Sequence, residues 1–110
     1  MSTWDITIGD DEAAIFTLTK DKHSVDLTGA TITAILVDAT TGVELVSAVQ
    51  DEANPNGDWS IGKIPIVFTN ANTSTIPTTT TKGKLQIKVL NEGSIITSWW
   101  FDKVTFRVGF

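Results

Sequence analysis

The sequence offers few side chains that could act in catalysis. It contains one histidine, His23, and no cysteine, so neither a multi-histidine nor a thiolate metal site can be assembled. His23 stands in the polar stretch Asp21–Ser24, where an exposed turn residue is expected. The carboxylates of Asp10, Asp11 and Glu12 also fall in a turn, where a solvated cluster is expected in place of a catalytic pair. We therefore predict no catalytic residues.

One loop has part of a calcium-binding pattern. In the stretch EANPNGDWSIGK, Glu52, Asn54 and Asn56 occupy the first, third and fifth positions of such a loop. The twelfth position, which should hold a bidentate glutamate, is Lys63, and Asn56-Gly57 is a strong turn dipeptide. The pattern therefore favours a simple hairpin loop, and we expect no metal and no cofactor.

The aromatic residues near the C-terminus are the most informative feature. The closing stretch IITSWWFDKVTFRVGF, from Ile95 to Phe110, reads as a strand in which Trp99 and Trp100 are adjacent. Successive side chains of a strand point to opposite faces, so the two indoles cannot both enter one core.

Two registers are compatible with this stretch. A bulge near Asp102-Lys103 would place Trp99 and Phe101 in the core and leave Trp100 outside. In a continuous register, Ile95, Trp99 and Phe101 would instead form an outward patch. In both, at least one tryptophan faces outward unless another segment covers it.

The outward tryptophan needs a cover. The threonine-rich stretch Asn70–Gly83 is one candidate, and a partner subunit is the other, because aromatic residues are enriched where proteins meet. The predicted strand Ala30–Asp38 is also apolar on both of its faces. We predict a protein interface that contains Trp99, Trp100, Phe101, Ile35 and Val37, with Trp4 as an additional member.

Composition restricts the partners. The chain has 110 residues, with eight basic and thirteen acidic side chains and a net charge of -5. Nucleic acid and anionic lipid both require clustered lysine and arginine, so neither nucleic acid nor a membrane is an expected partner. The N-terminal stretch MSTWDITIGDDE lacks the basic start and apolar stretch of a signal peptide, and we expect synthesis in a cytosol.

The elements that must position these residues read as strands. Threonine, isoleucine and valine are frequent, and no run has apolar residues at helical spacing. Short segments of strand character lie between turn signals. The predicted strands are Trp4–Ile8, Ala13–Lys20, Ala30–Asp38, Val43–Val49, Trp59–Thr69, Lys84–Leu90 and Ile95–Phe110.

Alternation within these strands predicts their core faces. Pro65 indicates an edge position or a bulge in its strand. Residues 51–58 and 70–83 are predicted to be loops, the second a long surface loop. The predicted inward side chains are Ala14, Phe16 and Leu18, then Ile32, Ala34 and Leu36, and finally Leu85, Ile87 and Val89.

About seven short strands in a chain of this length are typical of a two-sheet, immunoglobulin-like β-sandwich. The usual cysteine pair is missing, so we expect the architecture and not a true immunoglobulin domain. There is no internal repeat and no boundary signal, and residues 1–110 are predicted to form a single β-sandwich domain.

Part of the sequence resembles a known family. The segment VDLTGATIT, from Val25 to Thr33, is similar to a segment that opens a strand in the N-terminal domain of the baseplate upper proteins of tailed phages. The stretches FTLTKDKHSVDLTGATITAILVDATTG and KGKLQIKVLNEGSIITSWWFDKVTFRV resemble that domain's strand-turn-strand layout and its closing hairpin. The likeness extends from Ile6 to Val108.

This resemblance implies a β-sandwich that serves as an assembly module in a virion and has no catalytic residues. In the family, receptor-binding segments follow the domain, whereas this chain stops at Phe110, so we expect a small accessory, adaptor or decoration protein. We predict a non-enzymatic structural protein of a bacteriophage particle, made in the host cytoplasm, that contacts other virion proteins and copies of itself. The tail or baseplate is the first placement, and capsid decoration is the alternative.

A carbohydrate-binding module is the alternative from a different class. A sugar ring can stack on an exposed tryptophan flanked by amide or carboxylate side chains. Trp59 together with Asn54, Asn56 and Asp58 would supply such a surface. Glycan binding that is lost in Trp59→Ala or Trp99→Ala would favour this alternative, whereas recovery with purified virions would favour assembly.

Overall fold

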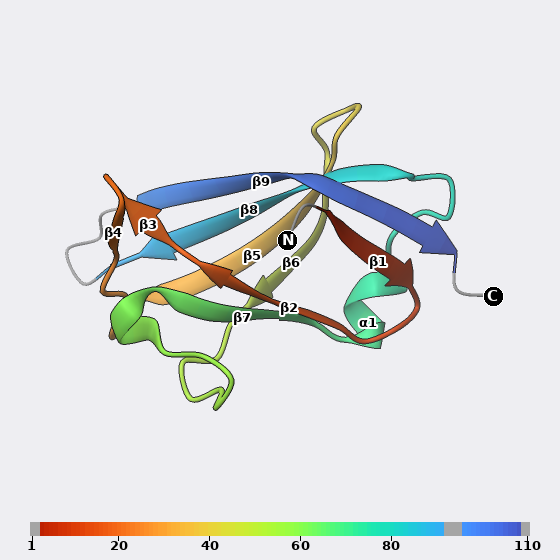
Figure 1. Cartoon of the computed structure of the whole chain (residues 1–110). Helices are drawn as coiled ribbons and strands as arrows, with labels where there is room; N and C mark the ends of the chain where they lie inside the picture. The colour runs from red at the N-terminus through yellow and green to blue at the C-terminus, as the bar shows by residue number, and fades with distance from the viewer. Residues whose placement is uncertain (1–2, 92–95, 109–110) are drawn as a thin grey trace.

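The computed structural model describes residues 3–91 and 96–108, and most of these form strands (Figure 1). A larger sheet has five strands in the order β1-β9-β8-β5-β6, and a smaller sheet pairs β2 with β7. The prediction of an all-β fold is therefore confirmed. The strands of these sheets are β1 (Trp4–Ile8), β2 (Glu12–Thr17), β5 (Thr31–Asp38), β6 (Glu44–Val49), β7 (Lys63–Phe68), β8 (Lys82–Leu90) and β9 (Ile96–Val108).

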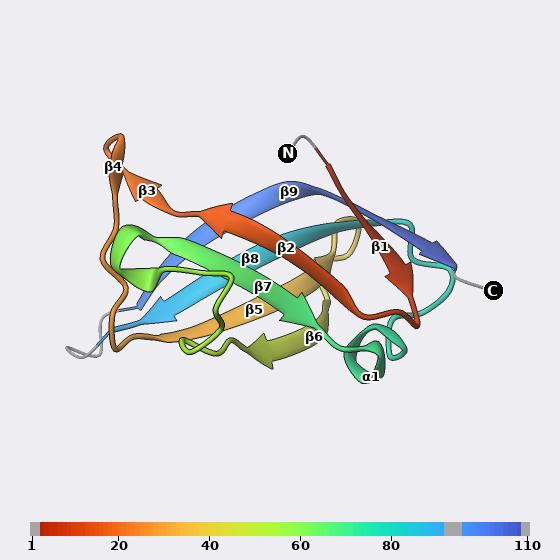
Figure 2. The same cartoon turned by 60° about the horizontal axis from the view of Figure 1, so that its bottom comes forward.

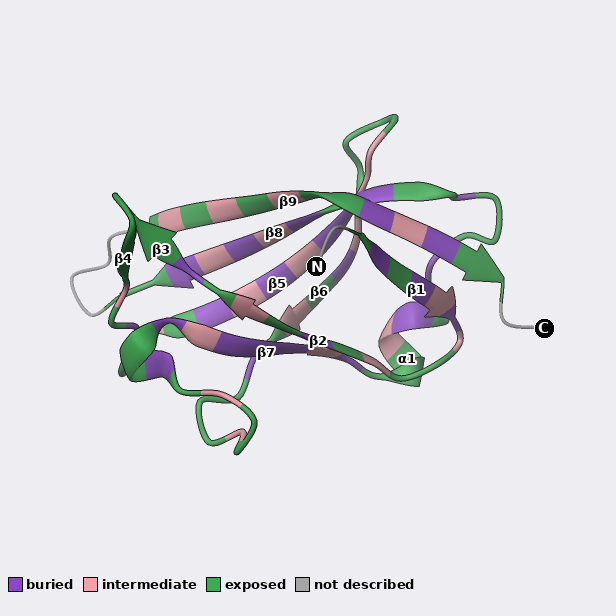
Figure 3. Cartoon of the chain, in the orientation of Figure 1, coloured by how far each residue is buried: buried purple, intermediate pink, exposed green. Residues whose placement is uncertain are grey.

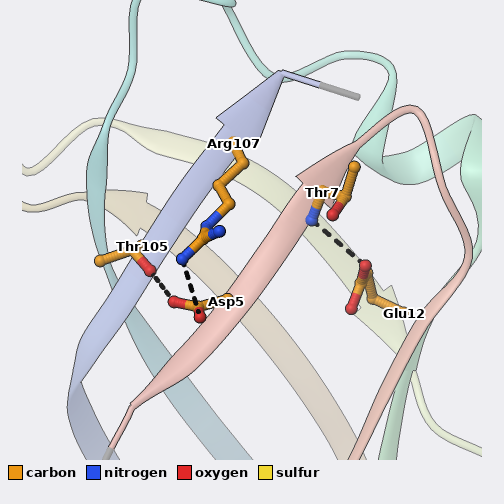
Figure 4. A network of polar contacts seen from close by, with 5 residues as sticks. All are labelled: Asp5, Thr7, Glu12, Thr105 and Arg107. Carbon is orange, nitrogen blue, oxygen red and sulfur yellow. Dashed lines mark hydrogen bonds and ion pairs between the residues drawn. The ribbon is translucent and has the colours of Figure 1, made fainter. Parts of the chain in front are cut away.

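The first strand pairs with the last. β1 runs parallel to β9, with Trp4 opposite Val104, whereas the other pairs in the described part of the chain are antiparallel. On the side away from the core, the Asp5 carboxylate accepts a hydrogen bond from the Thr105 hydroxyl (Figure 4). The same carboxylate lies 3.3 Å from the guanidinium of Arg107. These polar contacts join β1 to β9 outside the core.

The core lies between the two sheets. Figure 2 shows β2 and β7 crossing one face of the larger sheet. Along β1, β5 and β8 the side chains alternate between buried and more exposed positions, which gives the banded strands of Figure 3. The predicted inward faces of two strands are confirmed, because the exposed fraction is 4% or less for Ile32, Ala34, Leu36, Leu85, Ile87 and Val89.

On each side of the core, one side chain forms hydrogen bonds that link the two sheets. Gln50, just after β6, accepts a hydrogen bond from the backbone N–H of Val67 at 2.8 Å and donates one to its carbonyl at 3.3 Å. On the other side, Glu12 of β2 accepts a hydrogen bond from the N–H of Thr7 in β1 at 3.1 Å (Figure 4). Each side chain takes the hydrogen-bonding place of a further strand, so the edge backbone groups of Val67 and Thr7 have partners.

The predicted strand Ala13–Lys20 is divided in the structure. β2 ends at Thr17, and β3 (Thr19–Lys20) pairs with β4 (His23–Ser24) in a short hairpin. The two turn residues between them, Asp21 and Lys22, have φ values of 52° and 67°, which a tight two-residue hairpin requires. The predicted turn is correspondingly shorter, and His23 lies exposed on β4.

The predicted strand Trp59–Thr69 begins with a helical turn. η1 (Trp59–Ile61) follows Asp58, whose carboxylate accepts a hydrogen bond from the N–H of Ser60 at 3.1 Å. Gly62, the residue that follows η1, has a φ of 74°. The strand prediction was wrong for these residues because a side-chain cap and a left-handed glycine turn the chain before β7 begins.

The stretch Asn70–Gly83 is not the long loop that was predicted. It begins with α1 (Asn70–Thr73), and β8 already starts at Lys82. Thr69 caps α1 through a reciprocal pair of hydrogen bonds with Asn72, in which each side chain accepts from the other residue's backbone N–H. A local cap therefore creates structure where the sequence shows no apolar period.

This segment is also anchored to the rest of the fold. Thr73 is fully buried, and its hydroxyl accepts a hydrogen bond from the N–H of Gly9 at 3.1 Å and donates one to the carbonyl of Asp10 at 2.7 Å. Ile76 joins the core with an exposed fraction of 2%. The segment packs near β1, β6 and β7, and it leaves Trp100 exposed, so it does not provide the predicted cover.

Candidate interaction surface

A β-bulge in β9 determines which of the two adjacent tryptophans lies on the core side. In the pairing with β8, Gly83 lies opposite Val104, whereas Leu85 lies opposite Phe101. Two residues of β9, Asp102-Lys103, therefore face a single residue of β8, which defines a bulge. Of the two registers compatible with the sequence, the structure has the bulged one.

Trp99 lies on the core side of β9, and Trp100 faces outward. Trp99 packs against the core, and its Nε1–H donates a hydrogen bond to the carbonyl of Thr19 at 3.1 Å. Phe101 lies on the same side, with its ring centroid 5.4 Å from that of Phe16. Trp100 has an exposed fraction of 58%. Trp99 and Phe101 are thus core-side residues and do not form the outward patch of the continuous register.

Two further predicted contact residues are buried. The exposed fraction of Trp4 is 4%, and its ring centroid lies 5.7 Å from that of Phe16 and 5.9 Å from that of Phe68. The structure therefore places Trp4 in the core and not on a surface. Val37 lies on the outward side of β5, but only 8% of it is exposed. Ile35, on the same side, is half-buried.

The outer face of the larger sheet carries several apolar side chains among polar ones, and Trp100 is the largest of them. One cross-strand row runs from Ser47 in β6 through Ile35 and Gln86 to Trp100. Near the other end of β9, Leu90 pairs with Ile96 on the same face, and their exposed fractions are 41% and 57%. We name this surface the outer patch, and it consists of Ile35, Leu90, Ile96 and Trp100.

Leu90 and Ile96 were not among the predicted contact residues. Strand parity could have found both of them. Leu90 has the opposite parity to Leu85, Ile87 and Val89, which were predicted to face inward, and Ile96 has the same parity as Trp100. The patch is therefore larger along β8 and β9 than the tryptophans alone indicate.

Two shallow hollows lie within this face. One has a volume of about 230 Å³ and lies beside Trp100, with Asp38 and Lys84 in its lining. The other has a volume of about 320 Å³ and lies over Ile35, with Glu44 and Lys88 in its lining. Each hollow thus combines apolar surface with one lysine and one carboxylate, which is the mixture found where an apolar contact has a polar rim.

Several carboxylates accept hydrogen bonds that order nearby loops. Asp11 accepts a hydrogen bond from the N–H of Asn70 at 2.6 Å, and Glu52 accepts one from the N–H of Gly29 at 3.2 Å. Hydrogen bonds from the hydroxyl and the N–H of Thr28 lower the pKa of Asp26, which lies exposed in a turn. Within residues 3–91 and 96–108, no group of three or more acidic or histidine side chains is arranged to hold a metal ion.

The comparisons with known proteins supply no family. No family model matches the sequence, and no curated protein matches it significantly. In the described part of the chain, no helix has the length and apolar character that crossing a membrane requires.

Proposed function

We propose that this chain is a non-enzymatic assembly module of a tailed-phage particle and that the outer patch holds it to its neighbours. The resemblance of Val25–Thr33 and of the closing hairpin to baseplate upper proteins supports the proposal. A tail or baseplate accessory or adaptor is the first placement, and capsid decoration is the second. In either placement its partners are other virion proteins and further copies of the chain.

We also propose that the fold is an immunoglobulin-like β-sandwich. Three features support this: β1 runs parallel to β9, the larger sheet has the order β9-β8-β5-β6 beyond that pair, and β2 and β7 cover one face. An experimental structure in which β2 and β7 continue the larger sheet into a closed barrel would contradict this proposal.

The exposure of Trp100 is the observation that carries the functional proposal. Its indole is 58% exposed at the β9 end of a cross-strand row, on a face that also exposes Leu90 and Ile96. Large exposed apolar side chains on one face are a feature of contact sites, and tryptophan is among the residues that dominate binding energy at interfaces. The opposite face of the same sheet forms the core, so we assign the partner contact to the outer patch.

The test uses particles assembled without this protein. Purified wild type, Trp100→Ser and Ile15→Ser are added to such particles, and co-sedimentation gives the number of bound copies. Ile15 is the matched control, because it is an apolar residue of β2 with an exposed fraction of 50% and lies outside the outer patch.

We expect wild type and Ile15→Ser to bind equally, and Trp100→Ser to bind roughly tenfold more weakly or worse. Full binding by Trp100→Ser would contradict the role of the outer patch. No binding by any of the three proteins would contradict the phage assignment. Electron microscopy of the loaded particles then distinguishes a tail position from a capsid position.

Carbohydrate binding is the second candidate, and the hollow beside Trp100 favours it. Trp59 cannot serve as the stacking surface, because its exposed fraction is 4%. Beside Trp100, Asp38 and Lys84 are placed to bond the hydroxyl groups of a sugar stacked on the indole. A glycan array probed with wild type and Trp100→Ser tests this. A signal lost in the variant supports carbohydrate binding, and the absence of any signal contradicts it.

A further inference from the structure

A second association surface lies at the edge of the larger sheet. In the antiparallel pairing of β5 and β6, Ala48 lies opposite Ala34, and the N–H of Gln50 bonds the carbonyl of Ile32 at 2.8 Å. Bonded residues alternate along such a pair, so Ala48 bonds to β5 and its two neighbours do not. The N–H and C=O groups of Ser47 and Val49 therefore point away from the sheet.

The free edge of β7 shows how this chain blocks an edge. Lys63 exchanges two backbone hydrogen bonds with Asp58, at 2.9 and 3.0 Å. Pro65 has no N–H, and both backbone groups of Val67 are bonded by the side chain of Gln50. Pro65 thus has the edge position that the sequence predicted. No outward N–H of Lys63, Pro65 or Val67 is left for another strand.

The second half of β6 has no comparable protection. Ser47 is exposed, and the exposed fraction of Val49 is 70%. The segment Val46–Val49 contains no charged residue and no proline, and the bulge of this strand is confined to its beginning, near Glu44. An uncharged strand edge with free N–H and C=O groups is the feature that pairs with another strand.

We propose that β6 pairs antiparallel with β6 of a second copy, about a two-fold axis perpendicular to the sheet. When Ser47 of one copy lies opposite Val49 of the other, all four outward backbone groups of each copy find partners. The residue on the axis is Ala48, whose small side chain allows the two backbones to approach. No other occupant of this edge is required to satisfy its hydrogen bonds.

This pairing has a consequence for the outer patch. A two-fold axis perpendicular to the sheet keeps both outer faces on the same side of the joined sheets. The dimer would then present two copies of Trp100 to one partner surface, and the second contact would form at a high effective concentration. The edge pairing itself does not depend on the outer patch or on the phage assignment.

The experiment compares three full-length proteins by sedimentation equilibrium at concentrations up to roughly 100 µM. They are wild type, Ser47→Pro and Trp100→Ser. Proline removes the outward N–H of Ser47 and keeps the bonds between β6 and β5. We expect a dimer for wild type and for Trp100→Ser, and a monomer with an unchanged far-UV spectrum for Ser47→Pro. The result therefore distinguishes a wrong proposal for β6 pairing from a wrong proposal for the outer patch.

Hydrogen exchange gives a second measurement at single residues. In the dimer, the amides of Ser47 and Val49 should exchange slowly and lose this protection on dilution, whereas the amide of Ala48 stays protected throughout. If Ser47→Pro does not fold, Val49→Lys replaces it, because a lysine at a strand edge also opposes pairing. A wild-type monomer at all concentrations, or a dimer with freely exchanging Ser47 and Val49 amides, would overturn the proposal.

Discussion

Trp99 and Trp100 are identical neighbours in the sequence, and the backbone of β9 gives them different environments. Trp99 contacts the core and donates a hydrogen bond to the carbonyl of Thr19, whereas Trp100 has an exposed fraction of 58%. The nearby bulge at Asp102-Lys103 allows the inward side of β9 to change from odd to even residues. The strand's alternation separates the two indoles, and the inserted residue sets which of them faces the core.

Substitution of each indole should show this difference in stability. Trp99→Ala should lower the free energy of unfolding by about 2–3 kcal/mol, because it removes packing and a hydrogen bond. Trp100→Ala should change it by less than about 0.5 kcal/mol. Urea unfolding followed by circular dichroism measures both values, and similar losses in the two variants would contradict the assigned orientations.

The sequence could not choose between the two registers of this stretch. The change of parity between Phe101 and Val104 indicated a bulge, but an outward apolar face next to a partner fits the same residues. The choice depends on a neighbour distant in sequence. Opposite Val104, β8 has Gly83, and a Cβ there would lie 2.4 Å from Cε2 of Phe106, so the missing side chain makes room for that ring.

At the scale of elements, regular alternation was predictable and local caps were not. β1 has the predicted bounds, and β8 has the predicted inward face. η1 and α1 were missed because turns this short depend on single hydrogen bonds, such as those accepted by Asp58 and Thr69, and not on apolar periodicity. The bond between Gln50 and Val67 was also beyond sequence reasoning, because it depends on how the two sheets face each other.

The anchoring of α1 can be tested with an isosteric substitution. Thr73→Val keeps the size of a fully buried side chain but removes the hydroxyl that bonds Gly9 and Asp10. Because those two backbone groups lose their partner, we expect a loss of about 1–3 kcal/mol. Thr79→Val, at an exposed position of the same segment, is the control and should stay within about 0.5 kcal/mol of wild type. Equal thermal unfolding of both variants would show that the anchor contributes nothing.

At the scale of the whole molecule, the larger sheet uses its two faces and its two edges differently. One face packs on β2 and β7, and the other carries the outer patch. At one edge the N–H of Thr7 in β1 bonds the side chain of Glu12, whereas at the other edge β6 leaves the backbone groups of Ser47 and Val49 open. The two association surfaces that we propose therefore lie on different sides of the same sheet.

The order of folding can be measured with two matched substitutions. Ile6 in β1 and Ile87 in β8 have exposed fractions of 0% and 2%, so each change to valine should cost about 0.5–1.5 kcal/mol. β8 and β9 follow each other in the chain, whereas the pairing of β1 with β9 is long-range. We therefore expect Ile87→Val to slow folding and Ile6→Val mainly to accelerate unfolding. Stopped-flow kinetics in urea measures both rates, and the reverse assignment would contradict this order.

Because β1 pairs with the last strand of the chain, β1 is synthesised well before its partner β9. Asp5 and Thr105 are bonded although 100 residues separate them, and ribosomes add about 5–20 residues per second. The nascent chain therefore carries β1 without its partner for about 5–20 s. During that interval Trp4, Ile6 and Ile8 are open to wrong pairing with other nascent chains, so translation speed and chaperone supply should govern the yield of correctly folded protein.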